Sequence, residues 1–510
     1  MIRVLFFLFI LTQLGFAQKS KFWIFVKKDY QEISHYSELE KLDLEVLFQS
    51  RFLSAFSILA NQDEIPKIEK LPFVNKIQKV QTFVRKKITP QKVVHKNQVS
   101  DSTNYGLSEK QLTTITIDKL HEKGFFGEGI LIGVIDTGFN LEHEAFAGIK
   151  VIAERDFINN DSITKNEVGD SPTQDSHGTR VLSVLAGNSV GNLIGVTPKA
   201  SFVLAKTEID DQEIRIEEDN WVAALEWADS LGADLVTSSL GYNIFEDGTG
   251  YGKDELDGKT SVVAQAAKIA VERGMVVVVG AGNEGRNSPT TILTPADVEE
   301  VISVGAVNEF GEITSFSSNG PTSDGRIKPD ICAMGARVLT VSNFSDSTFT
   351  FSSGTSFSAP LVAGGIALLL ELDKTLTPKR VADGLRFTAN TDFGGNLPNN
   401  TYGYGIADFE RLFNFLEASP EDFDSWLVFP NPTSGKFKVQ IPLEVFFANF
   451  EAKIFNVLGQ EVKKFNGRFS SPIQEFSFWE NGEERLALGN YFLRIKAGNK
   501  TQNLKITLIK

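Results

Sequence analysis

Residues 261–285 read SVVAQAAKIAVERGMVVVVGAGNEG, and this stretch contains the repeating unit of the fold. Its first half spaces apolar residues as an amphipathic helix does, and Gly274 is expected to end that helix. The run MVVVV follows at once and predicts a strand that is buried on both faces. A glycine-rich turn with Asn283 comes next. The sequence therefore predicts a helix, a buried strand and a polar turn at the strand's carboxyl end.

The same alternation continues from about residue 112 to about residue 415. Strands are expected at GILIGVID (129–136), FVLAKT (202–207), ADLVTSSL (233–240) and VISVGAV (301–307), and helices at GTRVLSVLAG (178–187), WVAALEWADSLG (221–232) and SAPLVAGGIALLLEL (358–372). Apolar strands separated by helices predict an α/β fold with a doubly wound parallel sheet that is covered on both faces. In such sheets, functional sites gather at the carboxyl ends of the strands.

The two flanks of this region differ from it. Residues 18–100 predict a small α+β unit that begins with the strand candidate FWIFV (22–26), and residues 91–105 are a polar linker. From 420 to 510, short alternating strands separated by Gly, Pro and Asn turns predict a small all-β sandwich. The first 17 residues combine Arg3 with an apolar run and small residues, which favours a signal peptide over a membrane anchor because the run is short for a span.

Composition narrows the classes of function. The 510 residues include 51 Lys and Arg against 65 Asp and Glu, so the net charge is −14, which argues against nucleic acid as the main partner. Residues 18–100 are instead basic, with a net charge of about +6, so this segment has the charge to dock on the acidic remainder. Two unrelated solvated faces explain the same charges equally well. The single cysteine, Cys332, excludes an internal disulfide and is expected to be a buried apolar residue.

Four polar residues stand after predicted strands or at predicted helix starts. Asp136 ends the strand 129–136, Asn283 follows MVVVV, and His177 and Ser356 stand where helices begin. Each residue alone is more simply explained as a cap or a turn residue. Together they supply an orienting carboxylate, a general base, a nucleophile and an oxyanion donor at one edge of the sheet.

The motifs around these residues resemble those of the subtilisin-like serine peptidases. VIDTG (134–138), HGT (177–179) and GTSFSAP (354–360) occur in the order Asp, His, Ser, of which subtilisin is the standard example. AGNEG (281–285) resembles the family's oxyanion loop, KPDICAMG (328–335) the segment before its serine, and SSLGY (238–242) the strand that pairs with substrate. The resemblance covers about residues 112–412.

The resemblance implies a role for each residue. Ser356 would be the nucleophile, His177 the general base and acid, and Asp136 the residue that orients His177. The amide of Asn283 and the backbone N–H of Ser356 would form the oxyanion hole. Residues edging the primary specificity pocket would be Ser239, Leu240 and Gly241 on one side and Gly280, Ala281 and Gly282 on the other. The chemistry would need no cofactor. Structural calcium is common in the family, but no loop here supplies a clear set of oxygen ligands.

Several positions depart from the family pattern. Phe357 follows the serine where methionine is usual, and phenylalanine cannot form a sulfoxide, so the sequence predicts tolerance of mild peroxide. Arg180 and Met334 replace a frequent histidine and a frequent proline, which affects the pocket rather than the mechanism. Leu293 would lie near the base of the pocket, where it would favour small or medium apolar side chains.

Resemblance also extends to the flanks. Residues 18–100 occupy the place of the family's pro-segment, which inhibits the enzyme until it is cleaved, and residues 101–415 would form the catalytic domain. FPNPTSGKFKV (429–439), IFNVLGQEV (454–462) and LGNYFLRI (488–495) resemble the C-terminal sorting domains of type IX secretion cargo. A fibronectin-like accessory domain is the alternative. These features predict a secreted or cell-surface protein that the secretion machinery recognises through residues 420–510, with no transmembrane span.

The expected function is hydrolysis of polypeptide substrates through an acyl-enzyme by an endopeptidase that is made as a zymogen. One alternative is a surface-binding protein built on an inactive peptidase fold, but such a protein is expected to have lost at least one of the four site residues. Another is a processing peptidase that acts on a few partners, which the sequence does not distinguish from a broad degradative enzyme.

Overall fold

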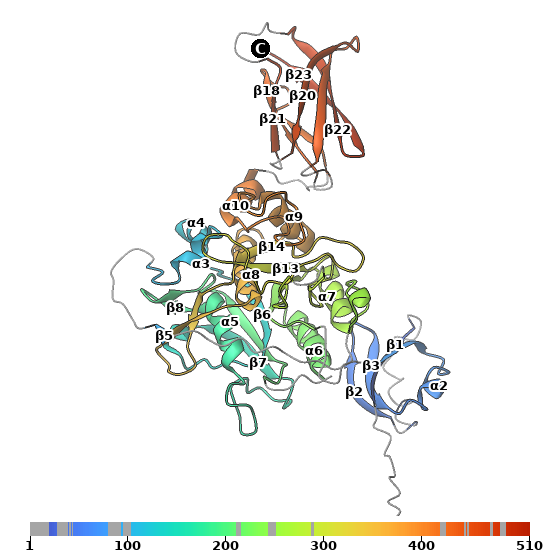
Figure 1. Ribbon diagram of the computed structural model, residues 1–510, viewed down its shortest axis with the longest axis vertical. Coiled ribbons are helices and arrows are strands. Elements are labelled where there is room, and N and C mark those ends of the chain that lie inside the picture. The colour runs from blue at the N-terminus through green and yellow to red at the C-terminus, as the bar shows by residue number, and fades with distance from the viewer. Residues whose placement is uncertain are drawn as a thin grey trace, which may run out of the picture. The chain divides into compact units, whose positions relative to one another are not determined.

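The computed structural model describes residues 20–27, 39, 42, 44–79, 93–94, 104–210, 216–242, 251–286, 290–418, 425–442, 445, 448–469, 473–479 and 486–510 (Figure 1). The signal peptide predicted at 1–17 and most of the linker predicted at 91–105 lie outside these residues. The chain divides into a unit of residues 1–81 and a unit of residues 82–510, and each is described by itself.

The first unit contains an antiparallel sheet in the order β2-β3-β1-β4. Its strands are β1 (Ser20–Val26), β2 (Glu45–Ser50), β3 (Ala55–Ala60) and β4 (Val74–Lys79), and α2 (Ile65–Ile68) stands between β3 and β4. Phe22 and Ile24 of β1 pack with Ile58 of β3 and Ile68 of α2 in a separate apolar cluster. This segment is the small α+β unit predicted before the main domain.

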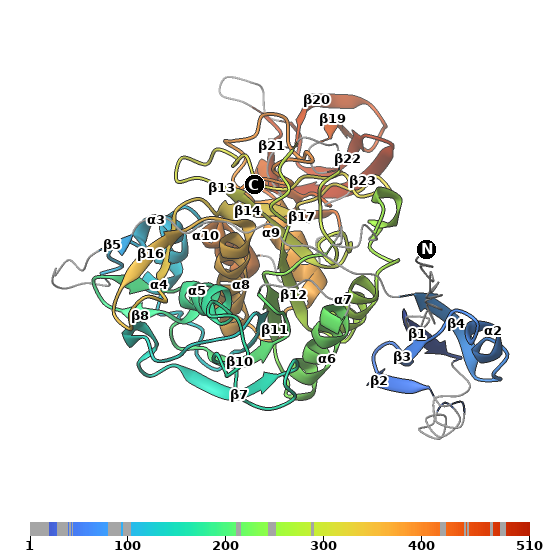
Figure 2. The same cartoon turned by 60° about the horizontal axis from the view of Figure 1, so that its bottom comes forward.

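The second unit contains a seven-stranded sheet in the order β14-β13-β12-β11-β6-β10-β7 (Figure 2). All its paired strands are parallel: β6 (Leu131–Asp136), β7 (Lys150–Asp156), β10 (Ser201–Lys206), β11 (Leu235–Ser238), β12 (Val276–Gly280), β13 (Ile302–Val307) and β14 (Ile331–Met334). The strands that follow β6 first lie on one side of it and later on the other. The strand order thus reverses at β6, where open α/β sheets bind their ligands.

Helices cover both faces of this sheet (Figure 2). On one face, α6 (Ile216–Ser230) packs against α7 (Val262–Glu272), and on the other, α5 (Ser176–Ala186) packs against α8 (Thr355–Leu372). Gly133 of β6 allows α6 to lie close, because a Cβ there would be 3.3 Å from Ala228 Cβ. Gly274, with φ of +104°, ends α7 as predicted.

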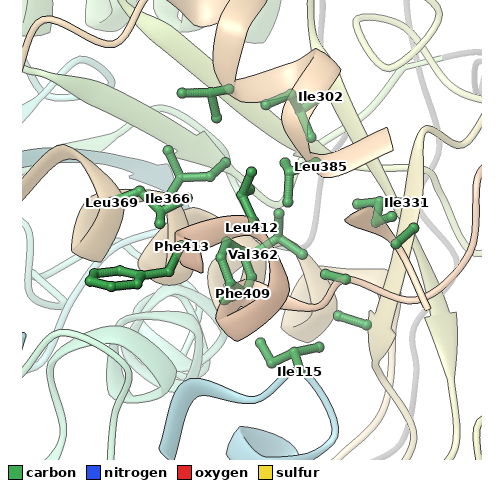
Figure 3. Close-up of a cluster of buried hydrophobic side chains, with 14 of the residues drawn as sticks. Ile115, Ile302, Ile331, Val362, Ile366, Leu369, Leu385, Phe409, Leu412 and Phe413 are labelled. Carbon is green, nitrogen blue, oxygen red and sulfur yellow. The ribbon is translucent and has the colours of Figure 1, made fainter. Parts of the chain in front are cut away.

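Helix α8 forms the centre of the core (Figure 3). Its side chains meet those of α9 (Pro378–Thr388), α10 (Phe409–Ala418), β13 and β14; the labelled residues are Ile115, Ile302, Ile331, Val362, Ile366, Leu369, Leu385, Phe409, Leu412 and Phe413. A Cβ at Gly365 would come within 2.3 Å of the Phe409 ring, so a glycine is needed there. Length and composition would allow α8 to cross a membrane, but 89% of it is buried inside the fold, as in a core helix.

Smaller elements complete the region: α3 (Glu109–Thr113), α4 (Ile117–Glu122), η3 (Glu144–Phe146), β8 (Asn188–Ser189), β9 (Leu193–Ile194), η4 (Lys253–Glu255) and the hairpin of β15 (Val338–Val341) and β16 (Phe349–Ser352).

Part of the predicted linker is not irregular. Val93 and Val94 form β5, which pairs with Thr350 and Phe349 of β16. Two β-branched residues can add to an open strand edge, and the polar composition of 91–105 concealed this pair.

The C-terminal module has two antiparallel sheets, as predicted. One contains β17 (Leu427–Phe429), β18 (Lys436–Gln440) and β21 (Ile473–Ser477), and the other has the order β20 (Glu461–Arg468), β19 (Asn449–Phe455), β22 (Gly489–Ala497), β23 (Lys500–Leu508). Along β22, Tyr491, Leu493 and Ile495 are buried while the residues between them are exposed. This alternation places one face of each sheet in a shared core.

Candidate active site

Asp136 and His177 are joined by a short hydrogen bond. Asp136 is the last residue of β6 and is fully buried, and its Oδ1 lies 2.6 Å from Nδ1 of His177 in the first turn of α5. The same Oδ1 accepts a hydrogen bond from the backbone N–H of Thr137 at 2.8 Å. Because an ionised carboxylate only accepts hydrogen bonds, the proton of a neutral His177 lies on Nδ1 and its Nε2 keeps a lone pair.

The residues that follow Asp136 hold α5 against the end of β6. The Thr137 hydroxyl accepts a hydrogen bond from Gly178 N–H at 3.3 Å. A Cβ at Gly178 would lie 2.3 Å from the carbonyl oxygen of Gly138, so only a glycine permits this approach. The small residue of the HGT motif thus allows His177 to reach Asp136.

Ser356 and Ser239 make two hydrogen bonds to each other. Ser356 is the second residue of α8, and its hydroxyl donates to the Ser239 carbonyl at 3.4 Å, while the Ser239 hydroxyl donates to the Ser356 carbonyl at 2.8 Å. Ser239 follows β11, the neighbour of β6. The ring of Phe357, the next residue of α8, lies 6.0 Å from the ring of His177. Asp136, His177 and Ser356 are therefore brought to one edge of the sheet.

Asn283 is oriented by Thr355. Its Oδ1 accepts hydrogen bonds from the backbone N–H of Thr355 at 2.9 Å and from the Thr355 hydroxyl at 3.2 Å. Thr355 Oγ1 in turn accepts a hydrogen bond from Gly282 N–H at 3.2 Å. With its oxygen engaged in this way, the Asn283 amide has a fixed orientation, and its NH₂ group is directed away from Thr355. Sequence motifs pointed to Asn283 but gave no indication of Thr355, because this contact spans 72 residues.

Leu293 fills the space between the two predicted pocket edges. A Cβ at Gly241 would lie 2.9 Å from both Cβ and Cδ1 of Leu293, and a Cβ at Gly282 would lie 2.6 Å from its Cγ. The next residue, Thr294, exchanges backbone hydrogen bonds of 2.9 and 3.1 Å with Tyr242. Leu240, Gly280 and Ala281 lie on the same two edges and are buried.

A buried ammonium pairs with two carboxylates near the end of β10. Lys206 is fully buried, and its Nζ lies 2.7 Å from a carboxylate oxygen of Asp156 and 2.7 Å from one of Asp170. Burial alone would lower the pKa of Lys206, but the two carboxylates raise it. Nothing in FVLAKT separates this lysine from a surface residue at a strand end, because both acidic partners come from other segments.

Asp156 also belongs to a group of carboxylates with Asp161 and Glu167, whose oxygens lie within 4.8 Å of one another. Asp156 Oδ1 already accepts the backbone N–H groups of Ile158 and Asn159 at 2.6 and 3.0 Å. With Lys206 on its other oxygen, this donor set fits an ion-pair network rather than a calcium site, since calcium needs six to eight oxygen ligands.

The family departures lie beside these elements. Arg180 is one turn after His177, and its Nε donates to the Ser176 carbonyl at 3.1 Å. Met334 ends β14 with 4% of its surface exposed. Cys332 is fully buried in the same strand, and burial raises the pKa of its thiol.

Comparison with known proteins identifies both parts of the second unit. Residues 127–405 match the model of the "Subtilase family", and residues 427–510 match the model of the "Secretion system C-terminal sorting domain". Subtilisin DY of Bacillus licheniformis is 31% identical over 299 residues, which are 58% of this chain and 95% of that protein. An alkaline protease of Shouchella clausii is 25% identical over 383 residues, which are 74% of this chain and 84% of that protein.

Solved structures agree on the fold. Fervidolysin of Fervidobacterium pennivorans, a keratinolytic enzyme related to subtilisin, has a TM-score of 0.61 at 20% identity. The match covers 95% of this chain and 71% of fervidolysin. The epidermin leader peptide processing serine protease of Staphylococcus aureus has a TM-score of 0.58 at 18% identity. That match covers 78% of this chain and 99% of the protease. With its subtilisin-like parallel sheet, its family match and its relatives, the chain belongs to the subtilase family of serine peptidases and carries a C-terminal sorting domain of a secretion system.

Proposed function

We propose that Asp136, His177 and Ser356 are the catalytic triad of an endopeptidase that cleaves polypeptides through an acyl-enzyme. The observation that carries this proposal is the 2.6 Å contact between His177 Nδ1 and the buried carboxylate of Asp136 at the end of β6. The Ser356 hydroxyl donates to Ser239, which follows β11, the strand next to β6. The contact with Asp136 leaves Nε2 of His177 as the base.

In the first step, the Ser356 hydroxyl turns from the Ser239 carbonyl towards His177. Its Oγ bonds to the carbonyl carbon of the substrate while its proton moves to Nε2, and the carbonyl π electrons move to the oxygen. The tetrahedral intermediate then expels the amine, which takes the proton from Nε2. Water attacks the acyl-enzyme by the same sequence and releases the acid and the Ser356 hydroxyl. The Nδ1 proton stays on His177 throughout, and its hydrogen bond to the Asp136 carboxylate stabilises the imidazolium.

The negative charge on the substrate oxygen is assigned to Asn283 and to the backbone N–H of Ser356. The two hydrogen bonds from Thr355 to Asn283 Oδ1 support this role, because they fix the amide before the charge develops. Removal of one oxyanion donor is expected to lower kcat by roughly 10²–10³-fold.

The test compares wild-type precursor with Ser356→Ala precursor. Self-processing is measured by intact mass, labelling with an active-site serine probe, and hydrolysis with casein as the substrate. We expect only the wild type to mature, to be labelled at Ser356 and to cleave casein. Equal behaviour of the two proteins, with no label on Ser356, would instead favour a binding protein built on an inactive peptidase fold.

We further propose that Leu293 restricts the side chain accepted before the scissile bond. Its contacts with Gly241 and Gly282 support this role, because the side chain occupies space between the edges 239–241 and 280–282. The expected preference is for small or medium apolar residues. Leu293→Gly should raise kcat/KM for a substrate with Phe at this position relative to Ala by roughly tenfold, as a few buried methylene groups imply. A peptide library cleaved chiefly after Lys or Arg would contradict this assignment.

For the whole chain, we propose a zymogen with a signal peptide at 1–17, an inhibitory pro-segment at 18–100, the catalytic domain at 101–415 and the sorting domain at 420–510. The sorting domain points to secretion or the cell surface. Sequencing the N-terminus of the mature protein tests the pro-segment boundary, and a mature N-terminus well before residue 80 would contradict it. Adding the separately produced segment 18–100 to mature enzyme should inhibit it.

A further inference from the structure

Gln174 is a buried amide that makes three hydrogen bonds to the backbone of other segments. It stands three residues before His177, in the turn that leads into α5. Its Nε2 donates to the carbonyl oxygen of Thr137 at 2.6 Å and to that of Glu208 at 2.5 Å, and its Oε1 accepts the backbone N–H of Asp210 at 3.0 Å. Both N–H groups and the oxygen of the amide are therefore used.

The three bonds lie where β6 and β10 stop pairing. The two strands pair in parallel register up to Asp136, and Thr207 N–H still donates to the Asp136 carbonyl at 3.0 Å. Beyond this point, the amide of Gln174 connects the two backbones, because it bonds to Thr137 after β6 and to the segment 208–210 after β10. A side chain thus continues the contact between the two strands at the edge of the sheet that carries Asp136.

Thr137 connects these bonds to Asp136 and His177. Its N–H donates to Asp136 Oδ1 at 2.8 Å, its hydroxyl accepts Gly178 N–H at 3.3 Å, and its carbonyl accepts the amide of Gln174. Gly178 directly follows His177, whose Nδ1 lies 2.6 Å from the same oxygen of Asp136. A movement of Thr137 would therefore disturb both partners of the hydrogen bond between Asp136 and His177, and the Gln174 amide restrains that movement.

The segment on the other side of Gln174 is itself held in place. Asn220 of α6 donates from Nδ2 to the Thr207 carbonyl at 3.2 Å. The buried Tyr242 hydroxyl donates to the buried carboxylate of Glu208 at 2.7 Å. Burial raises the pKa of Tyr242 above its usual range, so this hydroxyl stays protonated and remains a donor. Gln174 therefore connects the end of β6 to a fixed support.

Thr173 offers a comparison, because it joins the same two loops in a simpler way. Its hydroxyl donates to the Asp210 carboxylate at 2.5 Å in an exposed position, and it is the neighbour of Gln174 in the turn. This contact ties the turn to the end of β10 alone. The contact of Gln174 with Thr137 adds the end of β6, next to Asp136.

These contacts give Gln174 a role that its volume alone does not explain. Resting on the proposed triad, we propose that Gln174 is a positioning residue, which holds Thr137 and thereby keeps Asp136 in line with His177 Nδ1. Methionine has a similar length and is apolar, so it would fill the same space without any of the three bonds. Positioning by hydrogen bonds and simple filling of space therefore predict different outcomes for Gln174→Met.

The first measurement observes the hydrogen bond between His177 and Asp136 directly. It uses the full chain with Ser356→Ala, which cannot process itself, so all proteins compared remain in one form. A proton in a short hydrogen bond is strongly deshielded, so the Nδ1 proton of His177 should give a low-field proton NMR signal, and its absence in Asp136→Asn assigns it. At the same pH, Gln174→Met should shift this signal upfield or abolish it, whereas Thr173→Val should leave it unchanged.

The second measurement compares kcat and KM in the active enzyme. Each precursor is matured in trans by tagged wild-type enzyme, which is then removed. Gln174→Met should lower kcat by roughly 10²-fold, the cost of a misplacement of about 1 Å. KM should change little, because the pocket edge 239–241 keeps its own hydrogen bond to Ser356. Thr173→Val should keep both constants.

A second variant covers loss of folding, which unfolding in urea detects. If Gln174→Met does not fold, Gln174→Asn takes its place. This variant keeps the amide on a shorter arm, which cannot reach both Thr137 and Asp210. The same upfield shift and loss of kcat are expected.

A wild-type NMR signal or a wild-type kcat in the folded variant of Gln174 overturns its positioning role. An equal loss in Thr173→Val overturns it as well, since any tie between the two loops would then suffice. Absence of Ser356 labelling in the wild type would instead contradict the proposed peptidase site, so the two failures are distinguishable.

Discussion

The carboxylate of Asp136 has a role that its amide isostere cannot fill. Asp136 Oδ1 accepts from both His177 Nδ1 and Thr137 N–H. In Asp136→Asn, the amide can donate towards His177 and stabilise the wrong tautomer, so kcat should fall by roughly 10⁴-fold with a small change in KM. Kinetics on a preparation quantified by an active-site titrant provide the measurement. If kcat falls less than tenfold, Asp136 does not orient the base.

Phe357 lies where an oxidisable residue would be expected, next to the His177 ring. Phenylalanine forms no sulfoxide, so activity should survive dilute peroxide, whereas Phe357→Met should lose activity over the same period. Residual activity is followed against time at equal enzyme concentration. Loss of wild-type activity at the rate of the methionine variant would contradict the prediction.

The proposed site residues could be singled out in the sequence because each lies in a short local motif. Asp136, His177 and Ser356 are each marked by neighbouring glycines and small residues. The residues that orient the site carry no such marking. Thr355 contacts Asn283 across 72 residues, so its role depends on tertiary packing and cannot be read from spacing.

Strand β14 and helix α9 are joined by a buried ionic network around Asp330. Its Oδ2 accepts from Lys328 Nζ at 2.7 Å and from Ser303 N–H at 2.9 Å, and its Oδ1 accepts from Arg386 at 2.7 Å. Despite complete burial, Lys328 and Arg386 lower the pKa of Asp330 to about 2. The network holds together elements that precede and follow α8, the helix that carries Ser356.

Breaking this network should destabilise the domain strongly. Asp330→Asn leaves the buried Lys328 without its counter-charge and Arg386 with only the 3.4 Å contact to Asp383. The free energy of unfolding should therefore fall by about 3–5 kcal/mol in urea titrations. The matched control is Asp324→Asn, at a partly exposed pair with Arg326, which should cost about 1 kcal/mol or less. Equal effects of the two substitutions would contradict a special role for Asp330.

The same network sets a pH dependence. Because the pKa of Asp330 falls from 3.8 to about 2 on folding, its stabilisation is complete above about pH 4 and is lost as the pH falls through 2. Wild-type stability should therefore decline over this window by about 2 kcal/mol more than that of Asp330→Asn. Thermal unfolding at a series of pH values measures this difference, and parallel curves would refute it.

Elements with strong periodicity were predictable, and shorter ones were not. The pair α7 and β12 follows directly from residues 261–280, because the apolar spacing changes at Gly274. The short strands β5 and β14 have no such pattern. Val93 and Val94 become a strand only because β16 offers an edge, and Ile331–Met334 is a strand because it pairs with β13.

Charge is distributed unevenly along the chain, and the C-terminal module differs in sign from the whole. Residues 427–510 contain 12 Lys and Arg against 7 Asp and Glu, although the net charge of the chain is −14. Its two sheets bury Phe437, Ile454 and Leu493, which belong to the same apolar cluster as the core around α8. A module that matches its own family model and has the opposite charge is expected to function independently of catalysis.

Ending the chain after residue 418 should therefore separate sorting from activity. The truncated protein should keep the kcat of the full-length enzyme but remain inside the cell, because it lacks the sorting domain. Immunoblots of cells and medium, together with assays of purified protein, measure both properties. As a control, full-length Ser356→Ala should be exported like the wild type. Export of the truncated protein would show that residues 427–510 do not direct sorting.

The ammonium of Lys206 has a consequence for where the enzyme can work. It pairs with both Asp156 and Asp170 from inside the fold, attached to the chain that it stabilises. A bound metal ion stabilises a protein only in proportion to the logarithm of its free concentration, and dilution or a chelator removes it. Neither dilution nor a chelator removes a side-chain cation, because it is covalently attached to the chain. At the end of β10, the counter-ion is therefore a part of the enzyme and stays in place in any medium.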